Sequence, residues 1–246
     1  MKKKLLIFIL TYKAKNKVYE VYKKIKFKEL KNFKTYLLIS DDCSKDSTIL
    51  YSKKILKEYK NSKLIINKKN LGYGGNIKKC ISYAIKNNFD YAVMIHGDGQ
   101  YSPKYIKSLV KILLKNNFFA STGSRLKSGV KSAVFGGMPI YKLIGNIFLT
   151  KFFNFVFNTN FKDAHTGLWA YKINLFKKIK LKSLPNSFNF DQKIRISLIK
   201  NNLKIKEIPI QTIYADERSQ LHIIYAIKFF LITLFYFLRL NYFFNK

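Results

Sequence analysis

The chain has 246 residues, of which 48% are hydrophobic and 16% aromatic; this suits one well-buried α/β domain and excludes a disordered chain. Its 47 Lys and Arg against 13 Asp and Glu give a formal net charge of +34, which favours anionic partners such as lipid headgroups and polyphosphates. The lysines are spread along the sequence without an arginine-rich block, so we expect no nucleic-acid partner and keep a non-catalytic nucleic-acid-binding protein only as a remote alternative.

The N-terminus has some features of a secretory signal peptide, because lysines precede the apolar run 5–10. That run is six residues long, shorter than the ~7–15 residues of a signal peptide, and Tyr12-Lys13 replaces a small-residue cleavage site. We therefore expect a buried first strand, with the signal peptide as the alternative. Cys43 and Cys80 show no metal-ligand spacing and suit a reducing cytosol.

Short apolar runs alternate with lysine-rich helical patterns through the first half. This alternation predicts a parallel sheet with helices on both faces. Asp46 and the pair Ser102-Pro103 are expected helix starts. The predicted strands are 5–10, 36–40, 64–67, 91–95 and 120–123, and the predicted helices include 47–59 and 76–86.

The pattern changes after Arg125. A Gly-Gly-Met-Pro breaker at 136–139 precedes an apolar, aromatic-rich stretch at 140–157. A helix at 191–201 and a strand at 204–210 are expected further on. No linker is long enough to divide the chain into independent domains.

Polar or glycine-rich residues follow each of the five predicted strands of the first half. Open parallel sheets bind ligands at the carboxyl ends of their strands, so these residues should converge on one crevice. They are, in chain order, Thr11-Tyr12, Asp41-Asp42, the loop 70–76, the turn 96–100 and Ser124-Arg125.

In this order, the segments 41–48, 70–76, 98–100, 123–125 and 207–210 resemble family 2 glycosyltransferases of the glycosyltransferase A fold, and among them the dolichyl- and polyprenyl-phosphate sugar transferases. The resemblance covers residues 3–215. It implies a Rossmann-like, mostly parallel sheet, a UDP- or GDP-sugar donor and inversion at the anomeric carbon. We expect a glycosyltransferase domain at 1–215, with a nucleotide-sugar-binding half at 1–125 and an acceptor-side half at 126–215.

The resemblance also implies which residues hold the donor. A carboxylate at Asp41 or Asp42 can accept hydrogen bonds from the base or ribose, and glycines let the backbone approach a ligand closely. Ordinary turn chemistry is the alternative for both motifs. The loop 70–76 lacks GxGxxG spacing and follows the third strand, which argues against a hydride-transfer enzyme. The expected donor-binding residues are Thr11, Tyr12, Asp41, Asp42, Asn70, Gly72, Gly75 and Asp98.

A metal is expected around Asp98, because a divalent ion neutralises the diphosphate as the sugar–phosphate bond breaks. The family's Asp-x-Asp-x-Gln motif reads here His96-Gly97-Asp98-Gly99-Gln100. Asp98 and Gln100 are expected ligands of Mg²⁺ or Mn²⁺, and His96 suits Mn²⁺ or else a hydrogen bond near the nucleotide. A buried turn aspartate is the alternative for Asp98.

On the acceptor side, Arg125 and Lys142 are expected to bind phosphate, although Lys142 is also explained as one more solvated lysine. Asp163 and Asp191 are candidate bases for a hydroxyl acceptor, whereas a lipid phosphate is already an anion and needs none. His165 is a candidate acceptor-binding residue, with a structural histidine as the alternative. The predicted catalytic residues are thus Asp98, Arg125, Asp163 and Asp191.

Two positions depart from the dolichyl-phosphate branch. Lys193 stands where this branch often has a glutamate, and Tyr12-Lys13-Ala14 replaces its usual Tyr-Asn-Glu. The preferred function is metal-dependent, inverting sugar transfer to a polyprenyl phosphate. The alternative is transfer to a sugar hydroxyl in surface polysaccharide biosynthesis.

The apolar C-terminal segment 216–246 is predicted to associate with the membrane. Residues 221–244 would extend about 36 Å as a helix, enough to cross a bilayer. Lys228 and Arg239 interrupt the run and fall only about 20° apart around the axis. We expect an amphipathic helix in the plane of the inner face of the cell membrane, which makes the protein cytoplasmic and peripheral. A core helix and a single transmembrane pass are the alternatives.

Overall fold

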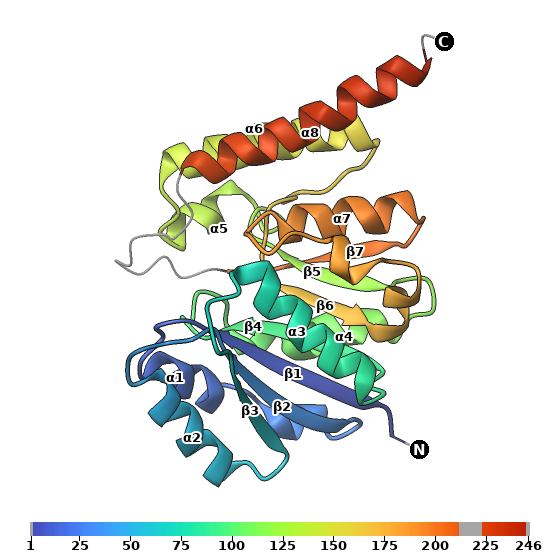
Figure 1. Ribbon diagram of the computed structural model, residues 1–246. Coiled ribbons are helices and arrows are strands. Elements are labelled where there is room, and N and C mark those ends of the chain that lie inside the picture. Colours follow the sequence, from blue (N-terminus) through green and yellow to red (C-terminus); the bar gives the residue numbers. More distant parts are fainter. Residues whose placement is uncertain (1, 212–222, 245–246) are drawn as a thin grey trace.

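The computed structural model describes residues 2–211 and 223–244 (Figure 1). In this part of the chain, seven strands form one sheet in the order β3-β2-β1-β4-β6-β5-β7. Their bounds are β1 (Lys4–Thr11), β2 (Lys34–Asp41), β3 (Ser62–Ile66), β4 (Tyr91–His96), β5 (Ala120–Ser124), β6 (Trp169–Lys172) and β7 (Ile205–Pro209).

The helices fill the intervals between the strands. The α-helices are α1 (Lys17–Lys23), α2 (Thr48–Glu58), α3 (Tyr73–Lys86), α4 (Ile106–Leu113), α5 (Val130–Phe135), α6 (Ile140–Phe157), α7 (Phe190–Lys200) and α8 (Ile223–Phe244). Short 3₁₀ helices are η1 (Phe27–Leu30), η2 (Pro103–Tyr105), η3 (Ile173–Lys177) and η4 (Leu181–Ser183).

The strand directions place the site. β1 is parallel to β2 and β4, β2 is parallel to β3, and β5 is parallel to β7. β6 is antiparallel to both of its neighbours, β4 and β5. The six other strands therefore end at one edge of the sheet, as the sequence predicted, but β6 separates the end of β5 from that of β4.

Helices cover both faces of the sheet, which confirms the predicted fold class. Leu5, Ile7 and Ile9 of β1 pack in one core with residues of α1, α2 and α4. Leu6 and Phe8 point the other way, into a core shared with α3 and α7. This alternation is the two-residue period of a strand that is buried on both sides.

Two predicted helix starts are confirmed. The amide of Thr48, the first residue of α2, donates to Asp46 Oδ1 at 3.0 Å. Ser102 Oγ accepts from the Lys104 amide at 3.4 Å, with Pro103 as the first residue of η2. Both side chains satisfy amides that the first turn leaves without a partner.

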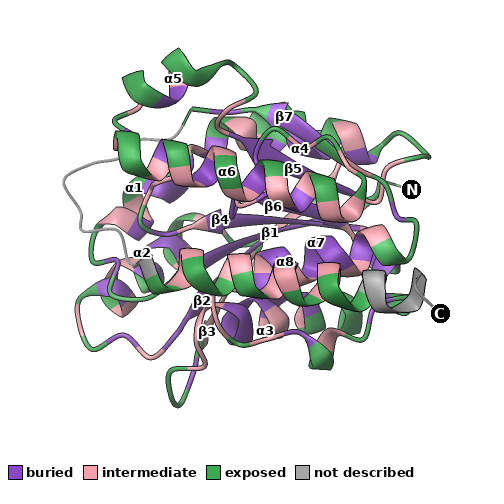
Figure 2. Cartoon of the chain, turned by 90° about the horizontal axis from the view of Figure 1, so that it is seen from above, coloured by how far each residue is buried: buried purple, intermediate pink, exposed green. Residues whose placement is uncertain are grey.

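α6 and α8 form a further layer outside the sheet and its helices (Figures 1 and 2). Rings join the two helices, with the Phe152 and Phe230 centroids 5.1 Å apart and those of Phe157 and Tyr236 5.6 Å apart. Gln192 of α7 donates to Thr233 Oγ1 at 2.9 Å and so attaches α8 to the domain. The predicted C-terminal helix is therefore present from residue 223 onwards, and residues 216–222 lie outside the described part.

One helix in the described ranges, α6, is long and apolar enough to cross a bilayer, and 22% of this stretch is buried inside the protein. Its buried residues Leu143, Asn146, Thr150 and Phe153 lie on one face. Since Asn146 and Thr150 hydrogen-bond residues of the 163–164 segment, α6 lies on the domain along that face.

Candidate active site

The carboxyl ends of β1 and β2 are joined by Asp41. This carboxylate is fully buried. Its Oδ1 accepts from Thr11 Oγ1 at 3.0 Å and from Ser44 Oγ at 2.6 Å, and its Oδ2 accepts from the Ser44 amide at 2.8 Å. Asp41 and Thr11 therefore shape the turn after β2, which is the alternative that the sequence left open. The neighbouring Tyr12 is 40% exposed at the same edge.

Asp42 attaches the loop 70–76 to the end of β2. Its Oδ1 accepts from Asn67 Nδ2 at 2.9 Å and from the Leu71 amide at 2.8 Å. Asn67 also donates to Asn76 Oδ1 at 3.2 Å, which extends the network into α3. Asp42 Oδ2 accepts neither of the hydrogen bonds from Asn67 and Leu71, so it is the oxygen to which the predicted contact with the nucleotide would fall.

The glycines of the loop 70–76 pack against the chain itself. Asn70 Oδ1 accepts from the Gly72 amide at 2.8 Å, and Gly72 has a φ of +76°. A Cβ on Gly72 would come within 2.7 Å of the Asn186 carbonyl oxygen, to which the Gly75 amide donates at 3.2 Å. Close packing against residue 186 thus explains Gly72 without a ligand, and a role in donor binding stays a prediction.

The turn after β4 leaves Asp98 in solvent. Asp98 is exposed, and its Oδ1 accepts from the Gln100 amide at 2.9 Å, while Gly99 adopts a φ of +81°. The alternative of a buried aspartate does not hold for Asp98. An exposed carboxylate at a strand end, held only by its own turn, is free to meet a ligand.

His96 points from the end of β4 towards Gly167. Its Nε2 lies 3.0 Å from the Gly167 carbonyl oxygen and 3.4 Å from Tyr73 Oη. A carbonyl oxygen only accepts, so we assign the ring proton to Nε2, which leaves Nδ1 as the nitrogen able to bind a metal. A Cβ on Gly167 would lie 3.2 Å from His96 Cε1, so a side chain there would force the His96 ring to move by a few tenths of an ångström.

Tyr73 connects His96 to Asp191. Its hydroxyl donates to Asp191 Oδ2 at 2.8 Å, and its ring stacks on Phe188 with centroids 5.1 Å apart. The other carboxylate oxygen, Oδ1, is buried without a hydrogen-bond partner. Burial raises the pKa of Asp191 to about 7, against the opposing effects of the Tyr73 hydrogen bond and the Arg195 charge. A carboxyl with this pKa can exchange a proton near neutral pH.

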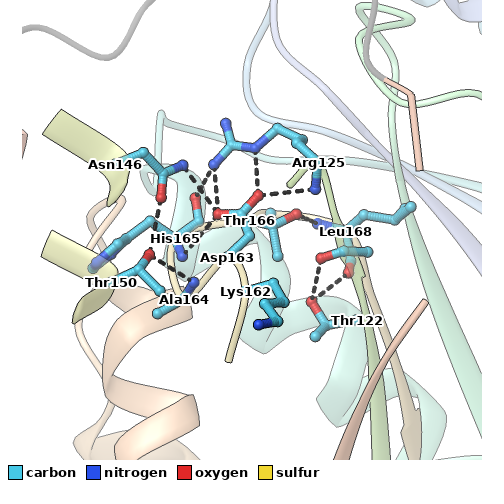
Figure 3. Close-up of polar contacts among 12 residues, drawn as sticks. Thr122, Arg125, Asn146, Thr150, Lys162, Asp163, Ala164, His165, Thr166 and Leu168 are labelled. Carbon is cyan, nitrogen blue, oxygen red and sulfur yellow. Dashed lines mark hydrogen bonds and ion pairs between the residues drawn. The ribbon is translucent and has the colours of Figure 1, made fainter. Parts of the chain in front are cut away.

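Arg125 and Asp163 form a buried, bidentate ion pair (Figure 3). Arg125 Nε donates to Asp163 Oδ2 at 2.6 Å and Nη2 donates to Oδ1 at 2.8 Å. Asn146 Nδ2 donates to the same Oδ1 at 3.0 Å. Burial by itself would raise the pKa of Asp163, but the charge and hydrogen bonds of Arg125 outweigh it and hold the pKa well below its usual range. Asp163 thus stays ionised and orients Arg125.

The segment that carries Asp163 is fixed from two sides. Glu207 Oε1 accepts from the Asp163 amide at 2.9 Å and its Oε2 accepts from the Lys162 amide at 2.8 Å. On the other side the Ala164 amide donates to Thr150 Oγ1 of α6 at 3.2 Å (Figure 3). The segment 162–164 is therefore held between β7 and α6 by hydrogen bonds on both sides.

Lys142 and His165 lie in different surroundings. Lys142 of α6 is partly buried; burial lowers its pKa, and the nearby Arg125 charge lowers it further. The two cations therefore share one region of the site. The His165 ring is turned towards α8, where it stacks on Phe229 with centroids 5.1 Å apart, and burial lowers its pKa to about 4. His165 is thus a neutral, buried ring, while its backbone oxygen accepts from Arg125 Nη2 at 3.1 Å.

The segment 163–167 brings the predicted residues into two linked groups. One group contains Arg125, Asp163 and Lys142. The other contains His96 and Asp191, which are joined through Tyr73. Asp41 and Asp42 lie further along the edge, beyond β1. Tyr73, Asn146 and Glu207 were not among the predicted site residues, although Tyr73 lies in the loop 70–76 and Glu207 in a motif that the sequence analysis quoted.

The metal prediction rests on few protein ligands. In residues 2–211 and 223–244, no three His, Cys, Asp or Glu side chains are grouped so that they could hold an ion. Mg²⁺ is often bound by one or two carboxylates together with substrate phosphates, and it keeps several waters. The exposed Asp98 and the neighbouring Gln100 fit that kind of site.

An open, mostly parallel sheet with polar turns at its carboxyl edge is the architecture in which α/β proteins bind nucleotides. The model of the family described as Glycosyl transferase family 2 matches residues 6–180, so the chain belongs to this family and is a glycosyltransferase. This membership confirms the resemblance and excludes the non-catalytic alternative.

Two curated relatives match most of the chain. Uncharacterized protein MJ1222 of Methanocaldococcus jannaschii is 28% identical over 87% of this chain and 84% of its own length. The UDP-N-acetylglucosamine–dolichyl-phosphate N-acetylglucosaminyltransferase of Methanococcus voltae is 27% identical over 73% of this chain and 75% of its own.

Solved structures share the fold. Glucosyl-3-phosphoglycerate synthase from Mycobacterium tuberculosis in complex with UDP has a TM-score of 0.66 at 12% identity and covers 96% of this chain and 80% of its own. The same enzyme in complex with Mn²⁺, UDP and phosphoglyceric acid has a TM-score of 0.61 at 11% identity, over 88% and 72%.

Proposed function

We propose that this glycosyltransferase uses a UDP- or GDP-sugar and a divalent ion, Mg²⁺ or Mn²⁺, and inverts the anomeric carbon. The observation that carries the proposal is the exposed Asp98 at the end of β4, next to Gln100 and within the edge where open sheets bind nucleotides. The fold neighbour that was solved with Mn²⁺ and UDP supports this choice of donor and ion.

Asp98 and Gln100, and His96 through Nδ1, would hold the ion with the donor's diphosphate. When bound, the ion neutralises the charge that develops on the leaving group. Oδ2 of Asp42 and the exposed Tyr12 would contact the nucleoside. We further propose that residues 1–125 form the donor half and residues 126–215 the acceptor half.

The acceptor we propose is a polyprenyl phosphate. Its phosphate is an anion at neutral pH and attacks without a base, so it needs cations that hold it. Lys142 and Arg125 supply them on the acceptor side, and Asp163 fixes the direction of the Arg125 fork. The dolichyl-phosphate transferase of Methanococcus voltae supports a lipid acceptor. Such a substrate also requires that the protein reach the inner face of the cell membrane.

A sugar hydroxyl is the second candidate acceptor, and Asp191 is the observation that favours it. A hydroxyl has a pKa far above 7 and needs a positioned base. Asp191, whose pKa burial raises to about 7, would receive that proton through Tyr73. Asp163 does not fit this role, because its oxygens already accept hydrogen bonds from Arg125 and Asn146.

The test measures transfer from a panel of UDP- and GDP-sugars to polyprenyl phosphate and, separately, to glycan acceptors. We expect labelled polyprenyl phosphate, loss of product in a chelator, and a raised KM for polyprenyl phosphate in Lys142→Gln at an unchanged KM for the donor. Lys111→Gln on α4 is the matched control, since this lysine is exposed and is not one of the predicted site residues. Product on glycans only, with Asp191→Asn inactive, would establish the hydroxyl acceptor instead.

A further inference from the structure

The exposed apolar side chains of this protein are concentrated on three helices. Thirteen of the eighteen large apolar side chains that are exposed in the described residues belong to α5, α6 and α8. We call these thirteen the apolar face: Val130, Val134, Phe135, Ile140, Tyr141, Ile144, Phe148, Phe155, Ile224, Ile227, Leu231, Phe235 and Leu238. A contiguous exposed apolar area of this kind marks a site of interaction.

The exposed residues form a stripe along each of the two long helices. On α6, at 100° per residue, they fall within about 100° of the helix circumference, opposite the buried Asn146 and Thr150. On α8 the five exposed apolar residues fall within about 80°, and Thr233 on the opposite side is buried. The two helices lie side by side (Figure 2), and the ring centroid of Phe155 in the α6 stripe lies 5.8 Å from that of Phe237 of α8.

The charge of these helices selects the partner. Residues 130–157 and 223–244 contain no Asp or Glu, and their charged residues are Lys131, Lys142, Lys151, Lys228 and Arg239. Lys228 and Arg239 are both exposed at one margin of the α8 stripe, where long basic side chains can reach phosphate while apolar neighbours enter the acyl region. A face that is apolar, basic and free of acidic residues complements an anionic bilayer.

We propose that the apolar face seats the protein on an anionic lipid bilayer, with α6 and α8 lying in the plane of its surface. This deepens the proposed function by naming the surface that meets the membrane. The opposite side of the same helices contacts the acceptor-side segment: Asn146 donates to Asp163, and Phe229 stacks on His165. Arg125 therefore lies on the side of α6 that faces away from the bilayer, and Lys142 is on α6 itself, so both cations are close to the surface that would supply a lipid phosphate.

The test uses the full chain and acceptor-free vesicles of phosphatidylcholine, with or without phosphatidylglycerol. Ile144→Asp and Leu231→Asp change side chains that are 62% and 52% exposed. Each removes an inserted apolar group, so we expect about tenfold weaker binding to the anionic vesicles. Leu50→Asp on α2 is the matched control: it is 68% exposed but lies off the face, and it should bind like the unchanged protein.

The charges provide a second measurement. Lys228→Gln should weaken binding about fivefold at low salt and less at high salt, whereas Lys57→Gln on α2 should have a smaller effect. Equal binding by the face variants and by Leu50→Asp would overturn the proposal. So would a full-length protein that ignores anionic vesicles and forms dimers that Ile144→Asp dissociates, because the occupant would then be a second copy.

Melting temperatures and donor binding in solution, measured on the same variants, show that each remains folded. They also separate this proposal from the proposed function. If the protein transfers sugar to a short, soluble polyprenyl phosphate but does not bind vesicles, the proposed membrane contact is disproved and the proposed enzymatic function still holds.

Discussion

At the scale of single residues, burial separates carboxylates that the sequence presents alike. Asp41 and Asp163 are buried, and both accept several hydrogen bonds from their own chain. Asp98 follows a strand just as Asp41 does, but it is exposed and holds only its own turn. The sequence therefore predicted several residues that the structure places at the carboxyl edge of the sheet, and their ligand-binding roles stay predictions. It could not identify which carboxylates are buried in their own hydrogen-bond networks, because burial depends on neighbours that are distant in sequence.

The Arg125–Asp163 pair gives a prediction for stability. Asp163→Asn removes the negative charge that pairs in a bidentate way with the Arg125 guanidinium, so we expect the free energy of unfolding to fall by about 3–5 kcal/mol. Urea denaturation measures this loss. Asp98→Asn is the control, since an exposed carboxylate contributes little to folding. An equal, small loss in both variants would show that the pair is not buried in the folded protein.

Asp191 gives a prediction for pH. Burial raises its pKa to about 7 in the folded protein, whereas an unfolded chain has about 3.9. The folded state therefore binds the proton more tightly. The contribution of this group to stability is complete below about pH 4 and is lost as the pH rises through about 7. Tyr73, Arg195 and Trp169 are the groups that act on this carboxyl.

Asp191→Asn cannot ionise, so we expect it to lose less stability between about pH 5 and about pH 8 than the unchanged protein. Thermal melting at the two pH values measures the difference. Parallel melting curves for the variant and the unchanged protein would mean that Asp191 is already ionised at the lower pH.

At the scale of elements, apolar periodicity predicted the strands that are buried on both faces and most of their helices. It missed β6, which has only four residues and lies antiparallel between β4 and β5. A strand this short has no period to detect, and only its long-range pairing reveals it. The boundary of α3 was also missed: the helix begins at Tyr73 inside the glycine loop, because Gly72 at φ +76° serves as its N-cap.

Gly72→Ala tests this helix start. The left-handed φ and the 2.7 Å approach of a Cβ to the Asn186 oxygen should together cost about 1 kcal/mol or more. Gly145→Ala in α6 is the matched control. A Cβ there meets nothing within 4 Å, so alanine should raise the free energy of unfolding by up to about 1 kcal/mol. Chemical denaturation of both variants measures whether the free energy of unfolding falls or rises. An unchanged free energy of unfolding in Gly72→Ala would contradict the described loop.

At the scale of the whole molecule, the fold stacks the three regions to which we assign proposed roles. The polar turns lie at the sheet edge, the segment 163–167 joins them to Arg125 and Lys142, and α6 and α8 form the outermost layer (Figure 1). The sequence predicted an amphipathic C-terminal helix from Lys228 and Arg239, and the structure describes that helix. The packing of α8 against α6 was not predictable, because the aromatic contacts between the two helices join residues about 80 positions apart.

Metal-dependent donor binding tests the central claim most directly. Calorimetric titration of UDP- and GDP-sugars into the full chain, with Mn²⁺ and with a chelator, should show one donor that binds only with the ion. Asp98→Ala should abolish that ion dependence and lower turnover by at least ~10²-fold, with an unchanged melting temperature. Undiminished donor binding in the chelator, or near-normal turnover by Asp98→Ala, would contradict the account.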